Sequence, residues 1–195
     1  ATNETPARMA RIFAAWPSAT TIDTTGEPEA PPTLPSFPMA DMVAALAVLD
    51  GSDVVYIEKV ESTHAVRMFS QIGRTMPAYS TGVGKAILAQ LLPDEVAQTL
   101  PERLEARTSA TITDRAALLR HLVEVRRRGY STDEVENEEG IRCVGAPVFD
   151  HTGIVCAGIS VAGPATRVTP ERTPELEKAK ASGGPSPKLQ RLPHQ

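Results

Sequence analysis

The segment from Gly140 to Pro164 constrains the fold of this chain most strongly. It contains two runs of β-branched and small residues, 142–149 and 154–161, separated by the polar group Asp150-His151-Thr152-Gly153. Strand formers on both sides of a short turn that ends in glycine predict a β-hairpin. Small residues are mixed with large apolar ones along both strands. They leave room beside a sheet, which is either filled by a packed helix or left open for a ligand.

Shorter patterns elsewhere predict the other strands. Residues 43–49 and 54–59 are apolar and β-branched, and the Asp50-Gly51 pair between them is a hairpin turn. Residues 65–69 are a candidate third strand. Strands paired through hairpins, with helical segments inserted between them, indicate an α+β domain whose sheet is mainly antiparallel and flanked by helices.

The helical segments are marked by apolar spacing and by their end signals. Residues 84–92 predict a helix that Pro93 ends, and residues 170–181 predict a last helix. The strongest pattern covers 114–128, where Asp114 caps the start and Gly129 follows the end. Its expected buried stripe consists of Leu118, Leu119, Leu122, Val123 and Val125. The arginines at 126–128 are expected to solvate the C-terminal end of this helix.

Composition divides the chain into three parts. Residues 1–40 are rich in proline and are expected to be a linker or arm, 41–181 a single domain, and 182–195 a flexible tail. A net charge of -4 argues against nucleic-acid binding by this chain alone. No apolar run approaches the length of a membrane span. Cys143 and Cys156 are expected to be reduced, buried thiols, and no residue spacing indicates a metal site or a cofactor.

Five motifs in order resemble one known family. They are LAVLDGSDVVYIEKVES (46–62), STGVGKAILA (80–89), ATITD (110–114), VRRRGYSTDEVENEEGIRCVGAPVFD (125–150) and ISVAGPATRVT (159–169). Together they resemble the C-terminal, effector-binding domain of IclR-type bacterial transcriptional regulators. The resemblance implies a GAF-like fold, no enzymatic activity and a cytoplasmic protein that forms dimers or tetramers. It also implies binding of a small organic or aromatic acid. DNA would be bound only through a winged helix-turn-helix, for which residues 1–40 show no pattern, so the chain is either a ligand domain or a divergent relative.

The resemblance also implies a set of ligand-binding residues. These are Met68, Gly82, Val83, Asp133, Cys143, Ser160 and Ala162, with Phe69 beside Met68. Gly82 and Val83 would supply backbone donors, whereas Asp133 and Ser160 would orient a polar ligand. Some members of the family have a second serine where this chain has Ala162. Losing that hydroxyl should weaken the binding of a small carboxylate and favour a more apolar ligand.

Several of these residues have an alternative, purely structural interpretation. Asp133 lies in an acidic run typical of a solvated loop, and Cys143 is equally compatible with an ordinary core position. The Gly82–Lys85 segment lacks two residues of a phosphate-binding loop, so it either holds a carboxylate or serves tight helix packing. Two further classes of function remain open. One is a hydrolase with Cys143 as nucleophile, for which no histidine base is evident; the other is an interaction module without a ligand.

Overall fold

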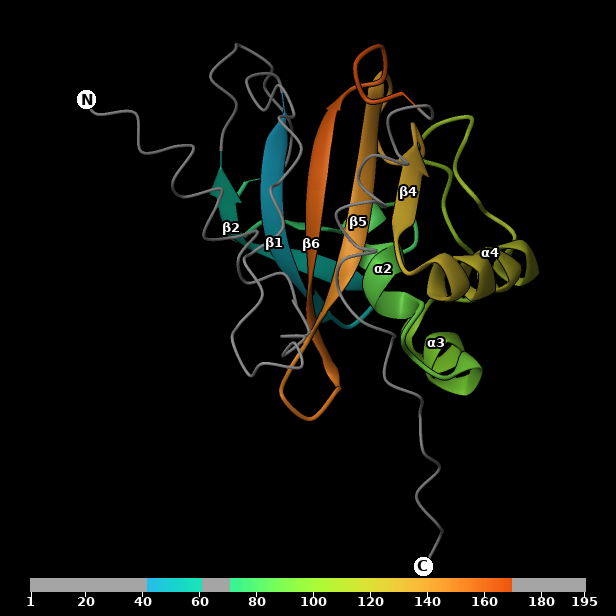
Figure 1. Ribbon diagram of the computed structural model, residues 1–195. Coiled ribbons are helices and arrows are strands. Elements are labelled where there is room, and N and C mark those ends of the chain that lie inside the picture. The colour runs from blue at the N-terminus through green and yellow to red at the C-terminus, as the bar shows by residue number, and fades with distance from the viewer. Residues whose placement is uncertain (1–41, 61–70, 170–195) are drawn as a thin grey trace, which may run out of the picture.

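A curled antiparallel sheet with helices beside it forms the fold (Figure 1). The computed structural model describes residues 42–60 and 71–169. Within them the strands are β1 (Val43–Asp50), β2 (Asp53–Val60), β3 (Thr75–Pro77), β4 (Ser131–Glu134), β5 (Ile141–Phe149) and β6 (Val155–Pro164). The helices are α2 (Gly82–Leu88), α3 (Pro93–Thr99) and α4 (Arg115–Arg128). The strand order is β3-β2-β1-β6-β5-β4, and each neighbouring pair is antiparallel. The predicted α+β class is confirmed.

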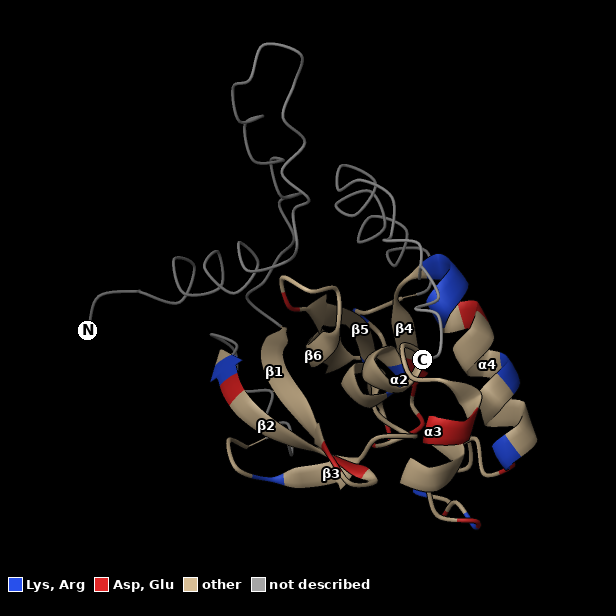
Figure 2. Cartoon of the chain, turned by 90° about the horizontal axis from the view of Figure 1, so that it is seen from below, with Lys and Arg blue, Asp and Glu red and all other residues tan. Residues whose placement is uncertain are grey.

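The two faces of the sheet carry different clusters of buried side chains. Figure 2 shows α2 inside the curve of the sheet, with α3 and α4 on the side of α2 that faces away from the sheet. On this face Val83 and Ile87 of α2 belong to the same apolar cluster as Leu118, Leu122 and Val125 of α4. The opposite face buries a second cluster, made up of Met42, Ala44, Val60, Val144, Val161 and Val168. Residues one position apart on β1, β5 and β6 therefore serve different faces, as strand geometry requires.

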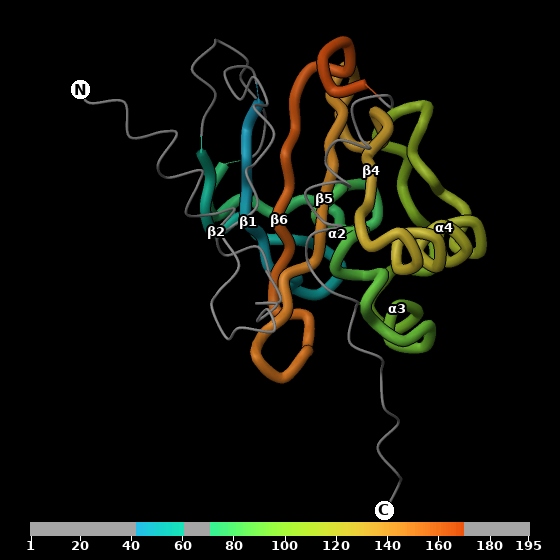
Figure 3. Tube along the Cα trace, viewed as in Figure 1, coloured from blue at the N-terminus to red at the C-terminus, as the bar shows by residue number. Residues whose placement is uncertain are grey.

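Both predicted hairpins are present. In the longer one, β5 and β6 pair from Ile141 opposite Pro164 to Phe149 opposite Val155. In Figure 3 the turn that joins these two strands lies at the lower end of the sheet. There the Asp150 Oδ1 accepts hydrogen bonds from the N–H groups of Thr152 (2.8 Å) and Ile154 (3.1 Å). Gly153 takes a left-handed φ of 82°, which explains the glycine at the end of this turn.

The prediction that both cysteines are buried is wrong for one of them. Cys143 is buried, whereas Cys156 is exposed. Cys156 lies where the pairing of β5 and β6 shifts its register, between Val155 and Ala157, which pair with Phe149 and Val148. A residue added by such a bulge is left without a partner in the ladder, so alternation does not decide which way it points.

The helix predicted over 84–92 is shorter and begins earlier. It begins at Gly82, where the Thr81 Oγ1 accepts a hydrogen bond from the Gly84 N–H at 3.2 Å, and its last residue is Leu88. Pro93, expected only to end this helix, is the first residue of α3. A proline fits the first position of a helix because its missing N–H would have no partner there. Because Pro93 was expected only to end a helix, α3 was not predicted from the sequence.

The prediction for α4 is confirmed at both ends but is partly wrong on its buried face. The Asp114 Oδ1 accepts a hydrogen bond from the Ala117 N–H at 2.7 Å, and Gly129 takes a φ of 76°. Val123, expected in the buried stripe, is 64% exposed. Arg126 does more than solvate the end of α4, because its guanidinium donates to the carbonyl oxygens of Ala89 and Leu91 and so fixes the end of α2.

Three expectations fall wholly or partly beyond the part of the chain that the structure describes. The third strand predicted at 65–69 and the last helix predicted at 170–181 lie outside the described residues. The short strand β3 was not predicted from the sequence. The proposed boundaries near residues 40 and 181 are likewise outside them. None of the helices within 42–60 and 71–169 has the length and apolar character that a membrane crossing requires.

Candidate functional site

Two adjacent rows of residues cross the sheet on the face that α2 covers. In the first row Asp133, Cys143, Ala162 and Val43 lie side by side on β4, β5, β6 and β1. In the second row, two residues further along each strand, lie Ser131, Gly145, Ser160 and Ala45. Residues that pair directly across strands share a face. The register therefore brings Asp133, Cys143, Ser160 and Ala162 together, although they come from three strands.

Small residues bring α2 close to the second row. A Cβ atom added to Gly145 would lie 2.6 Å from the carbonyl carbon of Gly82. A Cβ on Gly158 would lie 2.7 Å from the Cγ2 of Val83, and one on Gly84 only 2.4 Å from the Cα of Ala78. These three glycines allow tight packing of the helix. Close packing of a helix, one of the two explanations for the small residues that the sequence left open, is therefore present at the second row.

The other use, open space, is present next to the first row. A cavity of about 30 Å³ lies there, which is room for a few waters or part of a small molecule. Five of the predicted site residues line it: Gly82, Asp133, Cys143, Ser160 and Ala162. The remaining lining residues are Val43, Ala45, Tyr56, Met76, Thr81, Asn137, Glu138 and Ile141. The described lining thus mixes apolar side chains with a few polar groups and contains no basic residue.

Two predicted residues are not in this lining. The side chain of Val83 faces Gly158 instead and is buried in the apolar cluster between α2 and the sheet. Met68, like Phe69, lies outside the described residues. Tyr56 of β2, which was not predicted from the sequence, also lines the pocket. The only signal for Tyr56 in the sequence is that it is an aromatic residue in β2, the strand that forms a hairpin with β1.

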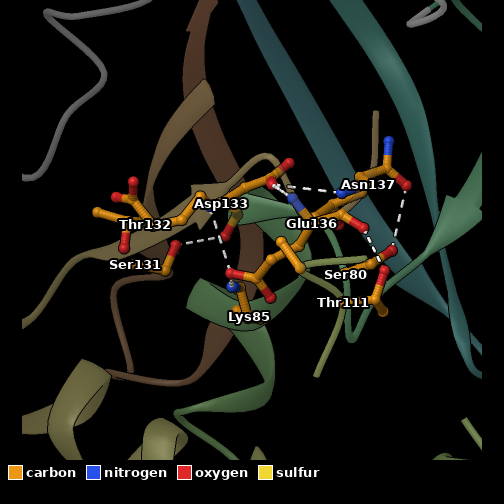
Figure 4. Close-up of polar contacts among 12 residues, drawn as sticks. Ser80, Lys85, Thr111, Ser131, Thr132, Asp133, Glu136 and Asn137 are labelled. Atoms are coloured by element: carbon orange, nitrogen blue, oxygen red, sulfur yellow. Dashed lines mark hydrogen bonds and ion pairs between the residues drawn. The ribbon is translucent and has the colours of Figure 1, made fainter. Parts of the chain in front are cut away.

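A buried network of charged groups lies next to the pocket (Figure 4). The ammonium of Lys85, on α2, forms an ion pair with the Oε1 of Glu136, in the turn after β4. Lys85 is fully buried and Glu136 is 4% exposed. Lys85 is thus already paired inside the protein, which argues against the idea that it holds an external carboxylate at the start of α2. The second oxygen of Glu136, Oε2, is buried and has no hydrogen-bond partner.

Asp133 is buried next to this ion pair rather than lying in a solvated acidic loop. It is 4% exposed, and its Oδ1 accepts hydrogen bonds from the N–H groups of Glu136 (2.6 Å) and Asn137 (3.3 Å). Burial raises the pKa of Asp133 to about 7, against the lowering effect of Lys85. The alternation of β4 turns Asp133 inward, which the acidic composition of the run concealed.

The raised pKa of Asp133 predicts a specific dependence of stability on pH. Because this pKa is higher in the folded than in the unfolded chain, the folded protein binds more protons between about pH 4 and pH 7. The contribution of Asp133 to the free energy of unfolding therefore falls as the pH rises through this window, by about 4 kcal/mol at most. In Asp133→Asn, which preserves the acceptor for both N–H groups, we expect this slope to disappear. Urea unfolding of both proteins at a series of pH values measures it, and equal slopes would contradict the prediction.

Cys143 is a poor nucleophile in this environment. Burial raises the pKa of its thiol to about 12, with Asp133 adding to the effect, and contacts from Ser160 and the Gly82 N–H oppose it only in part. Only the thiolate form of a cysteine reacts as a nucleophile. With the pKa at about 12, the fraction of Cys143 in this form at neutral pH is negligible. Cys143 therefore contributes shape and polarity to the wall of the pocket.

The chain is similar in sequence and in structure to known proteins. The family profile described as "Bacterial transcriptional regulator IclR C-terminal" matches residues 39–183. The HTH-type transcriptional regulator KdgR of Escherichia coli is 47% identical over 132 residues, which cover 67% of this chain and 50% of KdgR. The Thermotoga maritima IclR structure is 39% identical with a TM-score of 0.68, covering 74% of this chain and 59% of that one. The inducer-binding domain of an Acinetobacter PobR double mutant, in complex with 3-hydroxybenzoic acid, is 25% identical with a TM-score of 0.64, covering 72% and 86%.

The family match and the solved neighbours, which include an inducer-binding domain, place the chain in the class of effector-binding domains. Within that class, the chain belongs to the IclR family of bacterial transcriptional regulators, and the matched region is the C-terminal domain of the family. The chain spans about half the length of the curated relatives it matches. Those relatives are transcriptional regulators.

Proposed function

We propose that the pocket beside Gly82 binds a small organic or aromatic acid as an effector. The observation that carries this proposal is the convergence of Asp133, Cys143, Ser160 and Ala162 on one cavity next to Gly82. The related PobR domain, whose structure contains 3-hydroxybenzoic acid, supports an acid as the class of ligand. The small volume of the pocket favours a compact molecule, and the apolar side chains of Val43, Met76 and Ile141 would contact its hydrocarbon part.

The effector would act through the whole regulator. We propose that the protein containing residues 41–181 as its ligand domain binds DNA through a winged helix-turn-helix in the cytoplasm. In this proposal, 1–40 is an arm, 182–195 is a tail, and the domains assemble as a dimer or tetramer. Binding would shift the arrangement of the oligomer and thereby the spacing of its DNA-binding domains. The ligand can change that equilibrium only by its difference in affinity for the two arrangements.

The first test is a thermal-shift screen of the 195-residue chain against matched pairs of acids and amides. Acetate, lactate and 3-hydroxybenzoate are compared with acetamide, lactamide and 3-hydroxybenzamide at pH 6 and pH 8. A ligand present at about a hundred times its Kd stabilises the folded protein by about 2.7 kcal/mol, which is readily detected as a rise in Tm. We expect a rise with at least one acid. A folded chain that responds to no acid at either pH would contradict the proposal.

Changing the hydroxyl groups in the pocket should change the affinity in opposite directions. In Ser160→Ala, loss of one hydrogen bond should weaken binding of the responding acid by about three- to tenfold. Ala162→Ser adds a hydroxyl in the row of Asp133 and Cys143, and should strengthen binding by a similar factor. Gly82→Val should abolish binding, because a Cβ there would lie 2.8 Å from the Cys143 Sγ. Isothermal titration measures each Kd.

The control for these variants is Ser109→Ala, which removes a hydroxyl from an exposed loop position outside the lining of the pocket. We expect its affinity to match that of the parent protein. If Asp133→Ala, Ser160→Ala and Gly82→Val all retained the parent affinity, the ligand would bind elsewhere and the assignment of the pocket would be wrong.

We also propose that the chain has no enzymatic activity. A Cys-dependent hydrolase requires a thiolate and a nearby base, whereas burial raises the pKa of the Cys143 thiol to about 12. Within the described residues, no histidine is among the groups that affect the pKa of this thiol. Slow alkylation of Cys143 and no turnover of acyl esters are the expected results. Rapid hydrolysis that is lost in Cys143→Ser would overturn this view.

A further inference from the structure

The buried groups beside the pocket do not balance in charge. Two carboxyl groups, Asp133 and Glu136, share one buried ammonium, that of Lys85. Lys85 forms its ion pair with Glu136, so among the described residues Asp133 is the carboxyl group of this cluster without a direct cationic partner. Its hydrogen bonds come from the backbone and end on Oδ1, and its side chain lines the cavity. With all three groups ionised, the cluster carries one uncompensated negative charge at the site proposed for an acid.

Within the described residues, the titratable groups near Asp133 come from several elements. Lys85 approaches from α2, Tyr56 from β2, Cys143 from β5, and Glu136 and Glu138 from the turn after β4. Tyr56 and Cys143 are both uncharged near neutral pH, because burial raises the pKa of each above its ordinary value. Glu138 adds a second carboxyl group to the lining. A carboxylate that enters this pocket therefore meets the negative charge of Asp133, which costs most where water is excluded.

We propose that the pocket takes up a carboxylate effector together with one proton, which Asp133 holds in the complex. This inference rests on the proposed function. The acid enters as R–COO⁻, and one proton from solvent adds to the free oxygen of Asp133. The resulting O–H group donates a hydrogen bond to a carboxylate oxygen of the ligand. The total charge of Lys85, Glu136, Asp133 and the ligand is then -1, the same as that of the ionised cluster before binding.

This coupling fits the apolar side chain of Ala162 in the lining. A carboxylate needs hydrogen-bond donors, and Ala162 offers none from its side chain. Asp133 lies in the same row, separated from Ala162 by Cys143. In its protonated form it provides a donor on this side of the pocket. An ionised Asp133 would instead present a second acceptor to the ligand, so protonation converts repulsion into a hydrogen bond.

The expected effect is a strong dependence of affinity on pH. If only the form with protonated Asp133 binds the acid, the apparent Kd is the intrinsic Kd divided by the fraction of that form. Burial raises the pKa of Asp133 to about 7 in the free protein. The affinity for a carboxylate should then be about thirtyfold lower at pH 8.5 than at pH 6. The carboxylic acids used as probes are ionised over this whole range, so their own titration contributes nothing to the change.

The test is isothermal titration of the 195-residue chain with the responding acid and its amide between pH 6 and pH 8.5. At pH 8.5 the acid is titrated in two buffers of different ionisation enthalpy, which counts the protons taken up. Three variants accompany the parent protein. Asp133→Asn fixes a neutral donor at this position, Glu138→Gln removes the other carboxyl group of the lining, and Glu134→Gln removes a carboxyl group that pairs with Arg142.

The parent protein should show the thirtyfold change and uptake of close to one proton at pH 8.5. Asp133→Asn should show neither, while Glu138→Gln and Glu134→Gln should retain both. The neutral amide should bind without this dependence. An acid that binds equally well at both pH values, or a slope that disappears in Glu138→Gln and persists in Asp133→Asn, overturns the inference but leaves the acid-binding function intact. Binding of no acid at pH 6 overturns the proposed function itself, and the inference with it.

Discussion

Lys85→Met should destabilise the domain more than any other single change near the pocket. The substitution leaves Glu136 and Asp133 buried without a cation, and removing one partner of a buried ion pair typically costs about 3–5 kcal/mol. A domain of this size has a total stability of about 5–15 kcal/mol, so the loss is a large part of it. The free energy of unfolding from urea titration at pH 8 measures the effect. The loss should become smaller at pH 5, where Asp133 is protonated.

Glu136→Gln provides the informative comparison. It removes the partner of Lys85 but leaves Asp133 close enough to compensate for the buried ammonium. We therefore expect Glu136→Gln to cost less than Lys85→Met and to reduce, without abolishing, the weakening of the domain between pH 4 and pH 7, because burial is the main cause of the raised pKa of Asp133. The exposed pair of Glu124 and Arg127 is the control, since both side chains are more than half exposed and such pairs contribute about 0–1 kcal/mol. If Lys85→Met were no worse than Glu124→Gln, the ion pair would not stabilise the fold.

The parts of the fold that were predicted correctly are those that depend on local signals. The turn from Asp150 to Gly153 and the ends of α4 at Asp114 and Gly129 are set by hydrogen bonds and backbone angles within a few residues. Such signals are visible in the sequence because the interacting groups are neighbours in the chain. Pro93 shows the limit of this approach. The same proline is compatible with the end of one helix and the start of the next, and only the structure distinguishes them.

The charged network could not be predicted in the same way. Lys85 and Glu136 are 51 residues apart, and nothing in either local sequence indicates that they meet. Lys85 follows a glycine-rich loop, where a lysine is usually assigned to a ligand, and Glu136 belongs to an acidic run typical of a solvated loop. Their pairing depends on the docking of α2 against the sheet. That docking depends in turn on glycines on β5 and β6, whose role is apparent only once the register is known.

The glycines beneath α2 lead to the second large prediction, which concerns Gly145→Ala. A methyl group there would lie 2.6 Å from both the carbonyl carbon and the carbonyl oxygen of Gly82 and 2.8 Å from the Val83 nitrogen. These are backbone atoms at the start of α2, so no rotation of a side chain relieves the contact. Overpacking of this kind usually costs about 1–3 kcal/mol, and we expect the upper part of that range or more. Because α2 must move, Gly82 moves with it, and binding of the responding acid should be lost as well.

Two other glycines separate this steric effect from a general cost of losing glycine. In Gly158→Ala the closest backbone atom is the carbonyl oxygen of Val83, at 3.0 Å rather than 2.6 Å, so the loss should be smaller. In Gly73→Ala the new methyl group meets nothing within 4 Å, and only the φ of +80° opposes it, at about 1–2 kcal/mol. Gly73→Ala should also retain binding of the acid, because its cost comes from the backbone of an open turn. Unfolding free energies and acid affinities of the three variants test this order. If Gly145→Ala were as stable as Gly158→Ala and still bound the acid, α2 would not depend on Gly145 for its position against β5.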